Sequence, residues 1–285
     1  EMFNFEIFVN RILNITIAIL IFVFFSSCNI FFSKTEKIYI KGSDTMLMLT
    51  EKLAAEFMKQ NPNISIYVDG GGTVAGFKAL NEGSVDICMA SRNVSSEEVK
   101  LIAEKWKSVG YSILIGKDAL SVYVNLCNPV DNLNIKEIQD IFTGKKTNWN
   151  NFSGINNKIT VINRNSNSGT YDYFKNYILE GENYLNDAQI MNTTNAVADA
   201  VFKDSNAIGY GGIIYGTNVK HIKINGIEPS ISNVKNDSYP IIRYLHFYTL
   251  ENPKGNIRKF INWILSKDGQ QIVEKMGFIP IFHTN

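Results

Sequence analysis

The chain has 285 residues, of which 45% are hydrophobic and 19% are charged. This balance is normal for a globular protein, and the length is comfortable for two domains. The net charge of +1 gives no support for a nucleic-acid partner, because binding to a phosphate backbone needs a concentrated basic surface. The three cysteines and three histidines have no spacing typical of a zinc site, so we expect neither a metal nor a cofactor.

The N-terminal segment, residues 1–27, is predicted to be a secretory signal peptide. Arg11 precedes a mostly apolar run over 12–25, which is too short for a confident membrane-spanning helix, and the small residues Ser26 and Ser27 follow. The next residue, Cys28, stands where the lipobox of bacterial lipoproteins has its acylated cysteine, so this segment resembles a lipoprotein signal. We expect a lipid such as palmitate on Cys28. An uncleaved membrane anchor is the alternative, and either places the mature chain outside the cytoplasmic membrane.

The first part of the mature chain alternates between predicted strands and helices. Strands are predicted over 38–40, 64–68 and 86–90. The predicted helix 46–60 carries apolar Leu49, Leu53 and Phe57 on one face, since they recur four residues apart. A shorter helix is predicted over 77–81, and Ser95 with Glu98 forms a capping box for a helix that continues to Trp106. This order is typical of a mostly parallel sheet covered by helices.

The same alternation continues through the second part of the chain and predicts a second α/β lobe. A long apolar stretch over 241–249 precedes two C-terminal helices that end near Met276. We predict that residues 28–120 and 246–285 form lobe I and that residues 121–245 form lobe II. Two crossings between lobes make a hinge, and ligands usually bind in the cleft between such lobes. The further predicted elements are a strand over 120–124, a helix over 135–142, a strand over 159–162, helices over 171–179 and 196–202, and a strand over 207–209.

Three segments share one design, in which a strand is followed by Gly with Ser or Thr and then by a helix. A helix N-terminus presents unpaired N–H groups to an anion, glycine allows close approach of the backbone, and hydroxyls add donors. Any one segment could be a plain N-cap, but three at strand-to-helix junctions favour a shared oxyanion site. They are Gly42-Ser43-Asp44-Thr45, Gly70-Gly71-Gly72-Thr73 and Asn167-Ser168-Gly169-Thr170.

Two arginines follow predicted strands at the end where open α/β sheets bind ligands. Arg92 comes after Ser91 at the end of the strand 86–90, and Arg164 follows the strand 159–162. A guanidinium group fits a tetrahedral oxyanion through two parallel hydrogen bonds. The alternative role for each is a salt bridge, which is as good an interpretation as ligand binding for Arg92 alone.

Five segments, in order along residues 36–281, resemble the periplasmic phosphate-binding protein of the bacterial phosphate ABC transporter. The resemblance implies a two-lobed periplasmic-binding-protein fold of type II, phosphate as ligand, permease subunits as partners and a monomeric receptor without catalytic activity. The tryptophan of the third segment is interpreted as a packing residue. The segments are Lys41-Gly42-Ser43-Asp44-Thr45-Met46, Asp86-Ile87-Cys88-Met89-Ala90-Ser91-Arg92, Asp140-Ile141-Phe142-Thr143-Gly144-Lys145-Lys146-Thr147-Asn148-Trp149, Arg164-Asn165-Ser166-Asn167-Ser168-Gly169-Thr170 and the C-terminal stretch 265–280.

The resemblance also implies which residues contact the phosphate. The first loop would supply Thr45 with Ser43, and Thr73 stands where the family has Ser in the second loop. The remaining implied contacts are Ser91, Arg164, Ser168, Gly169 and Thr170. Longer family members have an aspartate after the strand-end serine, which accepts a hydrogen bond from the proton on phosphate, whereas this chain has Arg92. Asp44 is then the best candidate acceptor, with a role as helix N-cap as its alternative.

Several readings stay open at this level. A receptor for sulfate, molybdate or tungstate would suit Arg92 and Arg164, while Asp44 disfavours an anion without a proton, because two acceptors would then face each other. A hydrolase with Ser43 or Ser168 as nucleophile would need a nearby base, and no histidine lies beside these segments. A surface adhesin or sensor with the same fold is a further alternative. Whether Cys88 and Cys127 are free is also open.

Overall fold

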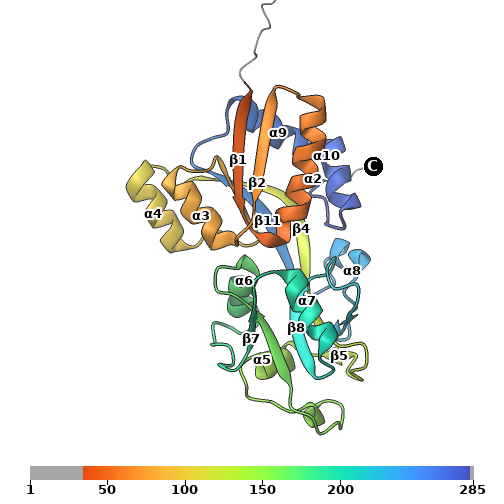
Figure 1. Ribbon diagram of the computed structural model, residues 1–285. Coiled ribbons are helices and arrows are strands. Elements are labelled where there is room, and N and C mark those ends of the chain that lie inside the picture. The colour runs from red at the N-terminus through yellow and green to blue at the C-terminus, as the bar shows by residue number, and fades with distance from the viewer. Residues whose placement is uncertain (1–34, 283–285) are drawn as a thin grey trace, which may run out of the picture. The chain divides into compact units, whose positions relative to one another are not determined.

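The structure, a computed structural model, describes residues 35–282. The predicted signal peptide 1–27 and the predicted lipid site Cys28 lie outside this range. Among the described residues, no helix is both long and apolar enough to cross a membrane. Two lobes, each with an α/β core, share one continuous nine-stranded sheet of order β2-β1-β3-β11-β4-β8-β6-β7, with β9 paired to β4 (Figure 1).

The first lobe begins with a parallel sheet, as the βαβ pattern predicts. Strand β1 pairs with β2 on one side and with β3 on the other, all in parallel. Its elements are β1 (Glu36–Gly42), α2 (Asp44–Gln60), β2 (Ile64–Asp69), α3 (Thr73–Glu82), β3 (Ile87–Ala90) and α4 (Ser96–Trp106). Helix α3 starts four residues before the predicted segment 77–81, because the glycine loop continues directly into the helix.

Strand β3 shows why this sheet is covered on both faces. Successive side chains of a strand point to opposite faces, and here Ile87 and Met89 belong to one apolar cluster while Cys88 and Ala90 belong to another. The first cluster contains Leu49, Leu53 and Phe57, so the predicted apolar face of α2 is confirmed. The C-terminal helices α9 (Gly255–Ile264) and α10 (Lys267–Lys275) complete it, with the rings of Phe57 and Phe260 centred 5.0 Å apart.

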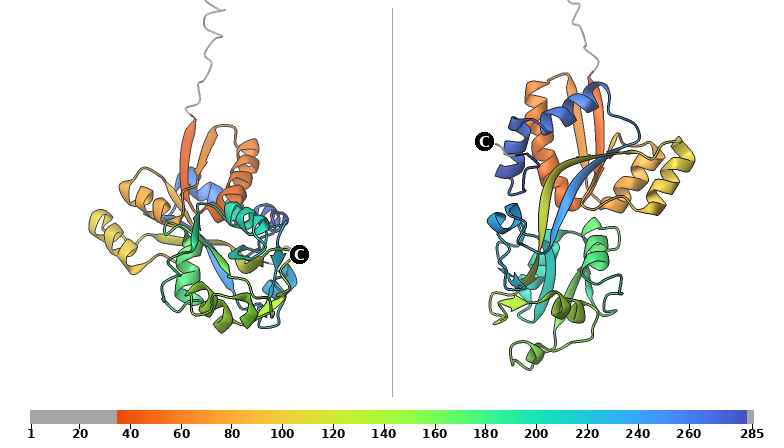
Figure 2. Two further views of the ribbon diagram at one scale, coloured as in Figure 1. Left: turned by 60° about the horizontal axis from the view of Figure 1, so that its bottom comes forward. Right: turned by 180° about the vertical axis from the view of Figure 1, so that it is seen from behind.

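Two long strands connect the lobes. Strand β4 (Tyr111–Val124) pairs antiparallel with β11 (Ile242–Thr249) along its first part. It then exchanges this partner for β8 between Ala119, which opposes Ile242, and Leu120, which opposes Gly212. The right-hand view of Figure 2 shows both strands running from one lobe to the other. Strand β4 begins nine residues before the start of the predicted strand 120–124. The two chain crossings expected of a hinge are thus made by β4 and β11.

The second lobe packs around a separate apolar core that includes Phe142, Trp149 and Phe174. Trp149 is buried and donates from its indole nitrogen to the carbonyl oxygen of Asn206 at 2.9 Å, which confirms its interpretation as a packing residue. The elements are β5 (Asn132–Leu133), α5 (Ile135–Phe142), the 3-10 helix η1 (Trp149–Asn151), β6 (Thr160–Arg164), α6 (Gly169–Tyr177), β7 (Gln189–Met191), α7 (Thr194–Lys203), β8 (Ala207–Gly212), β9 (Lys220–His221), β10 (Lys223–Ile224) and α8 (Ile231–Lys235).

Candidate anion-binding site

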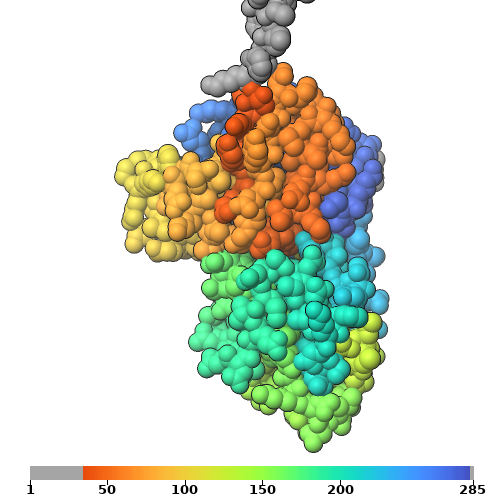
Figure 3. All heavy atoms as spheres, in the orientation of Figure 1, coloured from red at the N-terminus to blue at the C-terminus, as the bar shows by residue number. Residues whose placement is uncertain are grey.

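The three predicted loops meet where the two lobes touch. Thr45 of the first loop lies with its Oγ1 3.1 Å from the Oγ1 of Thr170 in the third loop. The second loop also reaches the third, because the backbone N–H of Val74 donates to the carbonyl of Asn167 at 3.2 Å. In the space-filling view the first lobe, red to orange, meets the second lobe, green to cyan, along one boundary (Figure 3). Three segments far apart in the sequence thus form one polar cluster.

Glycine makes this approach possible at Gly169. A Cβ at this position would lie 2.3 Å from the Oγ1 of Thr73 and 2.8 Å from the Oγ of Ser91. Both distances are far below van der Waals contact, so any side chain would separate the third loop from the second loop and from the end of β3. Close packing at Gly169 therefore brings the hydroxyls of Thr73 and Ser91 up to the third loop.

The serines of the cluster differ in what they bind. Ser43 occupies the N-cap position of α2 but makes no side-chain cap, and its Oγ donates instead to the Oγ of Ser91 at 2.9 Å. Ser168 does cap α6, accepting from the backbone N–H groups of Thr170 and Tyr171 at 3.2 and 3.4 Å. The side chain of Ser168 therefore acts as a helix cap, whereas the side chain of Ser43 does not. All of these serines are buried.

Arg164 is almost fully buried, at 1% exposure, at the end of β6. It donates to the hydroxyl of Thr194 at 2.9 Å, to the carbonyl of Asn192 at 2.9 Å and to the carboxylate of Asp44 at 3.1 Å. Burial lowers the pKa of Arg164, and the Asp44 carboxylate opposes that shift. Its Nε has no hydrogen-bond partner within residues 35–282. A buried donor without a partner costs free energy, and an anion between the lobes is a suitable acceptor.

Asp44 connects three parts of the cluster. One carboxylate oxygen accepts from Arg164 of the second lobe, and the other accepts from the backbone N–H of Gly71 in the second loop at 2.9 Å. Gly70 allows this contact, since a Cβ there would lie 2.6 Å from the same oxygen. Asp44 is the first residue of α2 and Ser43 is its N-cap. The alternative role of Asp44 as N-cap is therefore wrong.

Arg92, the other predicted arginine, is held by acceptors of the protein itself. Its guanidinium group donates to both carboxylate oxygens of Glu98 at 2.8 Å, to Asp172 at 2.9 Å and to the carbonyl of Asn93 at 2.8 Å. Burial acts to lower the pKa of Arg92, but the two carboxylates outweigh it and raise the pKa. Arg92 thus forms the salt bridges named as its alternative role, and its expected contact with the ligand stays a prediction.

Sequence reasoning missed Arg243 and its partner Asp118. Arg243 lies inside the apolar stretch 241–249, on β11, and donates to Asp118 on β4 at 3.0 and 2.7 Å. It also donates to the hydroxyls of Thr170 at 2.8 Å and Thr45 at 3.3 Å. The available signal was an arginine within a largely apolar strand, because such a residue needs buried acceptors.

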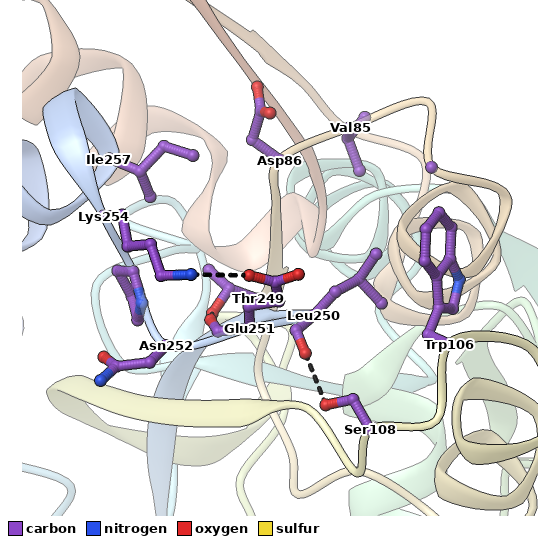
Figure 4. Close-up of a pocket in the computed structure, with 12 residues that line it drawn as sticks. Val85, Asp86, Trp106, Ser108, Thr249, Leu250, Glu251, Asn252, Lys254 and Ile257 are labelled. Atoms are coloured by element: carbon purple, nitrogen blue, oxygen red, sulfur yellow. Dashed lines mark hydrogen bonds and ion pairs between the residues drawn. The ribbon is translucent and has the colours of Figure 1, made fainter.

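Other candidate sites lie elsewhere. A pocket of about 330 Å³ in the first lobe is lined by Trp106, Thr249 and Lys254 among others, but by none of the predicted site residues (Figure 4). Cys88 and Cys127 are both free. Within the described range, no group of three or more His, Cys, Asp or Glu side chains could hold a metal ion. None of these features includes a residue of the loop cluster, which is the candidate site.

Comparisons with known proteins agree on one group. The profile of the PBP superfamily domain matches residues 33–268. The chain is 34% identical to the protein SphX of Synechococcus elongatus over 259 residues, covering 84% of this chain and 76% of that protein. It is 33% identical to the phosphate-binding protein PstS of Bacillus subtilis over 245 residues, covering 85% and 80%.

Solved structures of phosphate receptors are also similar to this chain. A candidate phosphate ABC transporter substrate-binding protein from Clostridium perfringens, solved with bound phosphate, has a TM-score of 0.79 and 32% identity, covering 87% of this chain and 100% of that one. An ABC-type phosphate transport receptor from Vibrio cholerae has a TM-score of 0.72 and 26% identity, covering 86% and 100%. The two-lobed fold is thus common to this chain and these receptors.

Proposed function

The chain belongs to the PBP superfamily and, within it, to the family of phosphate-binding PstS proteins, and we propose that it captures inorganic phosphate between its lobes. Outside the cytoplasmic membrane, the protein would deliver the bound phosphate to the permease of an ABC transporter. The observation that carries this proposal is the meeting of three hydroxyl-bearing loops, the first of which bonds the buried guanidinium of Arg164 through Asp44. Buried donors from both lobes suit a small tetrahedral anion enclosed by closure.

The proposed ligand contacts come from both lobes. The first lobe would supply Ser43, Thr45, Thr73 and Ser91, and the second would supply Arg164 with the third loop, Ser168 to Thr170. The division into residues 28–120 plus 246–285 and residues 121–245 remains our proposal. It is supported by the change of partner in β4 between Ala119 and Leu120.

Selectivity for phosphate is proposed to rest on Asp44. A carboxylate facing an oxyanion is unfavourable unless a proton lies between them, and phosphate near neutral pH carries such a proton whereas sulfate does not. Arg164 offsets part of the negative charge of Asp44 through their ion pair. This arrangement favours phosphate over the alternative ligands sulfate, molybdate and tungstate.

A hydrolase remains the less supported alternative. Of the two histidines in the described range, His246 bonds Ser112 at 2.9 Å and His221 bonds the carbonyl of Gly216 at 3.0 Å. Neither contacts Ser43 or Ser168, so within residues 35–282 no histidine serves the candidate nucleophiles as a base. We therefore propose a transport receptor, monomeric and anchored by lipid on Cys28.

Titration calorimetry with phosphate, sulfate and molybdate tests this function. The wild-type protein should bind phosphate more tightly than the other two anions. In Arg164→Ala the free energy of phosphate binding should be less favourable by about 2–5 kcal/mol, because a charged donor to a desolvated anion is removed. Thermal unfolding without ligand serves as the control for folding. Tighter binding of sulfate than of phosphate, or unchanged phosphate affinity in Arg164→Ala, would contradict the proposal.

A further inference from the structure

We infer that Arg243, held in place by Asp118, is a positioning residue of the anion site. Its role is to aim the hydroxyl hydrogens of two loop threonines, one from each lobe, at the bound ligand. This inference rests on the proposed function, since it takes the loop cluster to be an oxyanion site. It adds a residue that lies outside all three loops, on β11, and whose ion-pair partner lies on β4, the other strand that connects the lobes.

The ion pair of Arg243 and Asp118 is buried and held by two hydrogen bonds. The two residues lie directly opposite each other in the antiparallel register of β11 and β4, so their side chains emerge as cross-strand neighbours. Asp118 is 1% exposed and Arg243 is 2% exposed. Nε and Nη2 of the arginine both donate to the same carboxylate oxygen, at 3.0 and 2.7 Å. A buried pair with two hydrogen bonds holds the guanidinium plane in one orientation.

The remaining donors of this guanidinium reach the ligand loops. Nη1 lies 2.8 Å from the Oγ1 of Thr170, and Nη2 lies 3.3 Å from the Oγ1 of Thr45. A guanidinium group can only donate, so both threonine oxygens act as acceptors toward Arg243. Each hydroxyl has a single hydrogen, which must then point away from the arginine.

This orientation is the useful one for an anion. The two hydroxyl oxygens lie 3.1 Å apart, on loops of opposite lobes, so one hydroxyl donates to the other in this structure. Without a fixed donor behind it, a hydroxyl rotates and can present a lone pair to the ligand. With Arg243 behind both, a bound anion can replace this hydrogen bond and accept both hydrogens. Preorganised donors lose less free energy on binding than donors that must be reoriented.

The substitution Arg243→Lys tests this role. A lysine ammonium keeps the positive charge beside Asp118, but it lacks the planar fork that reaches Asp118 and both threonines together. Phosphate affinity measured by calorimetry should fall roughly tenfold or more. The matched control is Arg258→Lys on the exposed side of α9, which should keep wild-type affinity. Thermal unfolding without phosphate measures the effect on folding for each variant.

A double-mutant cycle separates positioning from a purely structural role. If Arg243 acts through the hydroxyl of Thr170, then Arg243→Lys should cost much less in a Thr170→Val background, with an additional loss of about twofold. Additive losses, or wild-type phosphate affinity in Arg243→Lys alone, would overturn the inference. If Arg243→Lys proves unfolded, the neutral pair Asp118→Asn with Arg243→Gln replaces it with the same expectations. If the wild-type protein binds sulfate or molybdate but not phosphate, the proposed function fails, and the cycle is measured with that anion.

Discussion

Arg92 and Asp172 form an ion pair between the two lobes, with Nε 2.9 Å from the carboxylate oxygen. Arg92 follows β3 of the first lobe, and Asp172 lies in the first turn of α6 in the second lobe. Glu98 holds the same guanidinium from within the first lobe. The pair requires the two lobes to be together, so its loss is expected to act on closure.

We predict that Asp172→Asn weakens phosphate binding modestly, by about fivefold at most, since partly exposed ion pairs contribute about 0.2–1 kcal/mol. Folding stability should change little, because burial raises the pKa of Asp172 more than Arg92 lowers it. Calorimetry and thermal unfolding measure the two effects. Glu182→Gln is the matched control, since Glu182 pairs with Lys145 inside the second lobe. Equal affinities in the two variants would exclude a role of Asp172 in closure.

A second prediction concerns His246, which is 6% exposed on β11 and bonds Ser112. Burial lowers its pKa from 6.5 to about 4. Between these values the unfolded chain takes up a proton and the folded protein does not, so stability falls as the pH falls from 6.5 to 4. From pH 7.5 to pH 5 the free energy of unfolding should drop by about 2 kcal/mol through this residue.

Denaturant unfolding at several pH values checks this expectation. His246→Asn, whose amide can still bond Ser112, should show a flatter dependence between pH 7.5 and pH 5. Burial also lowers the pKa of His221, so His221→Asn is measured in parallel to separate the two contributions. An unchanged pH dependence in His246→Asn would show that another group is responsible.

The helices of the first lobe could be predicted because their signals are local. Leu49, Leu53 and Phe57 lie within nine consecutive residues of one helix, and the capping box of Ser95 and Glu98 spans four residues. Strand β4 was underestimated, since residues 111–114 are mostly exposed and the apolar run 113–115 before Gly116 is too short to indicate a long strand.

The site was predicted less completely, for a reason of sequence distance. The loops can be recognised in the sequence, because glycine and hydroxyl residues stand beside the predicted helix starts. Arg243, in contrast, is defined by partners that lie 73, 125 and 198 residues away, and no pattern along the chain connects them. The contact of Arg92 with Asp172 spans 80 residues, which is why its salt bridge could be weighed from sequence but not assigned.

A third prediction tests the lipid anchor on Cys28. The wild-type protein, expressed with its N-terminal segment, should incorporate labelled fatty acid, and Cys28→Ser should not. Cys127→Ser is the matched control, because Cys127 is free and exposed on the folded protein. Equal labelling of wild type and Cys28→Ser would rule the anchor out.

The last prediction is that Asp44 distinguishes phosphate from sulfate. Its carboxylate is held by Arg164 at 3.1 Å and by the N–H of Gly71 at 2.9 Å, so it cannot easily turn away from a ligand placed between the loops. Asp44→Asn keeps the shape and removes the charge. The amide oxygen can still accept from the proton of phosphate, while its NH₂ group can donate to sulfate.

Phosphate affinity should therefore fall modestly in Asp44→Asn, sulfate affinity should rise, and the ratio between them should narrow. Removal of the negative charge also leaves Arg164 less neutralised, which favours a fully charged anion and acts in the same direction. Competition calorimetry with both anions measures the ratio directly. Asp69→Asn is the matched control, since Asp69 pairs with Lys41 on the exposed part of the first lobe. If Asp44→Asn keeps the wild-type ratio, the carboxylate only joins the loops, and the discrimination must come from the hydroxyls that Arg243 orients.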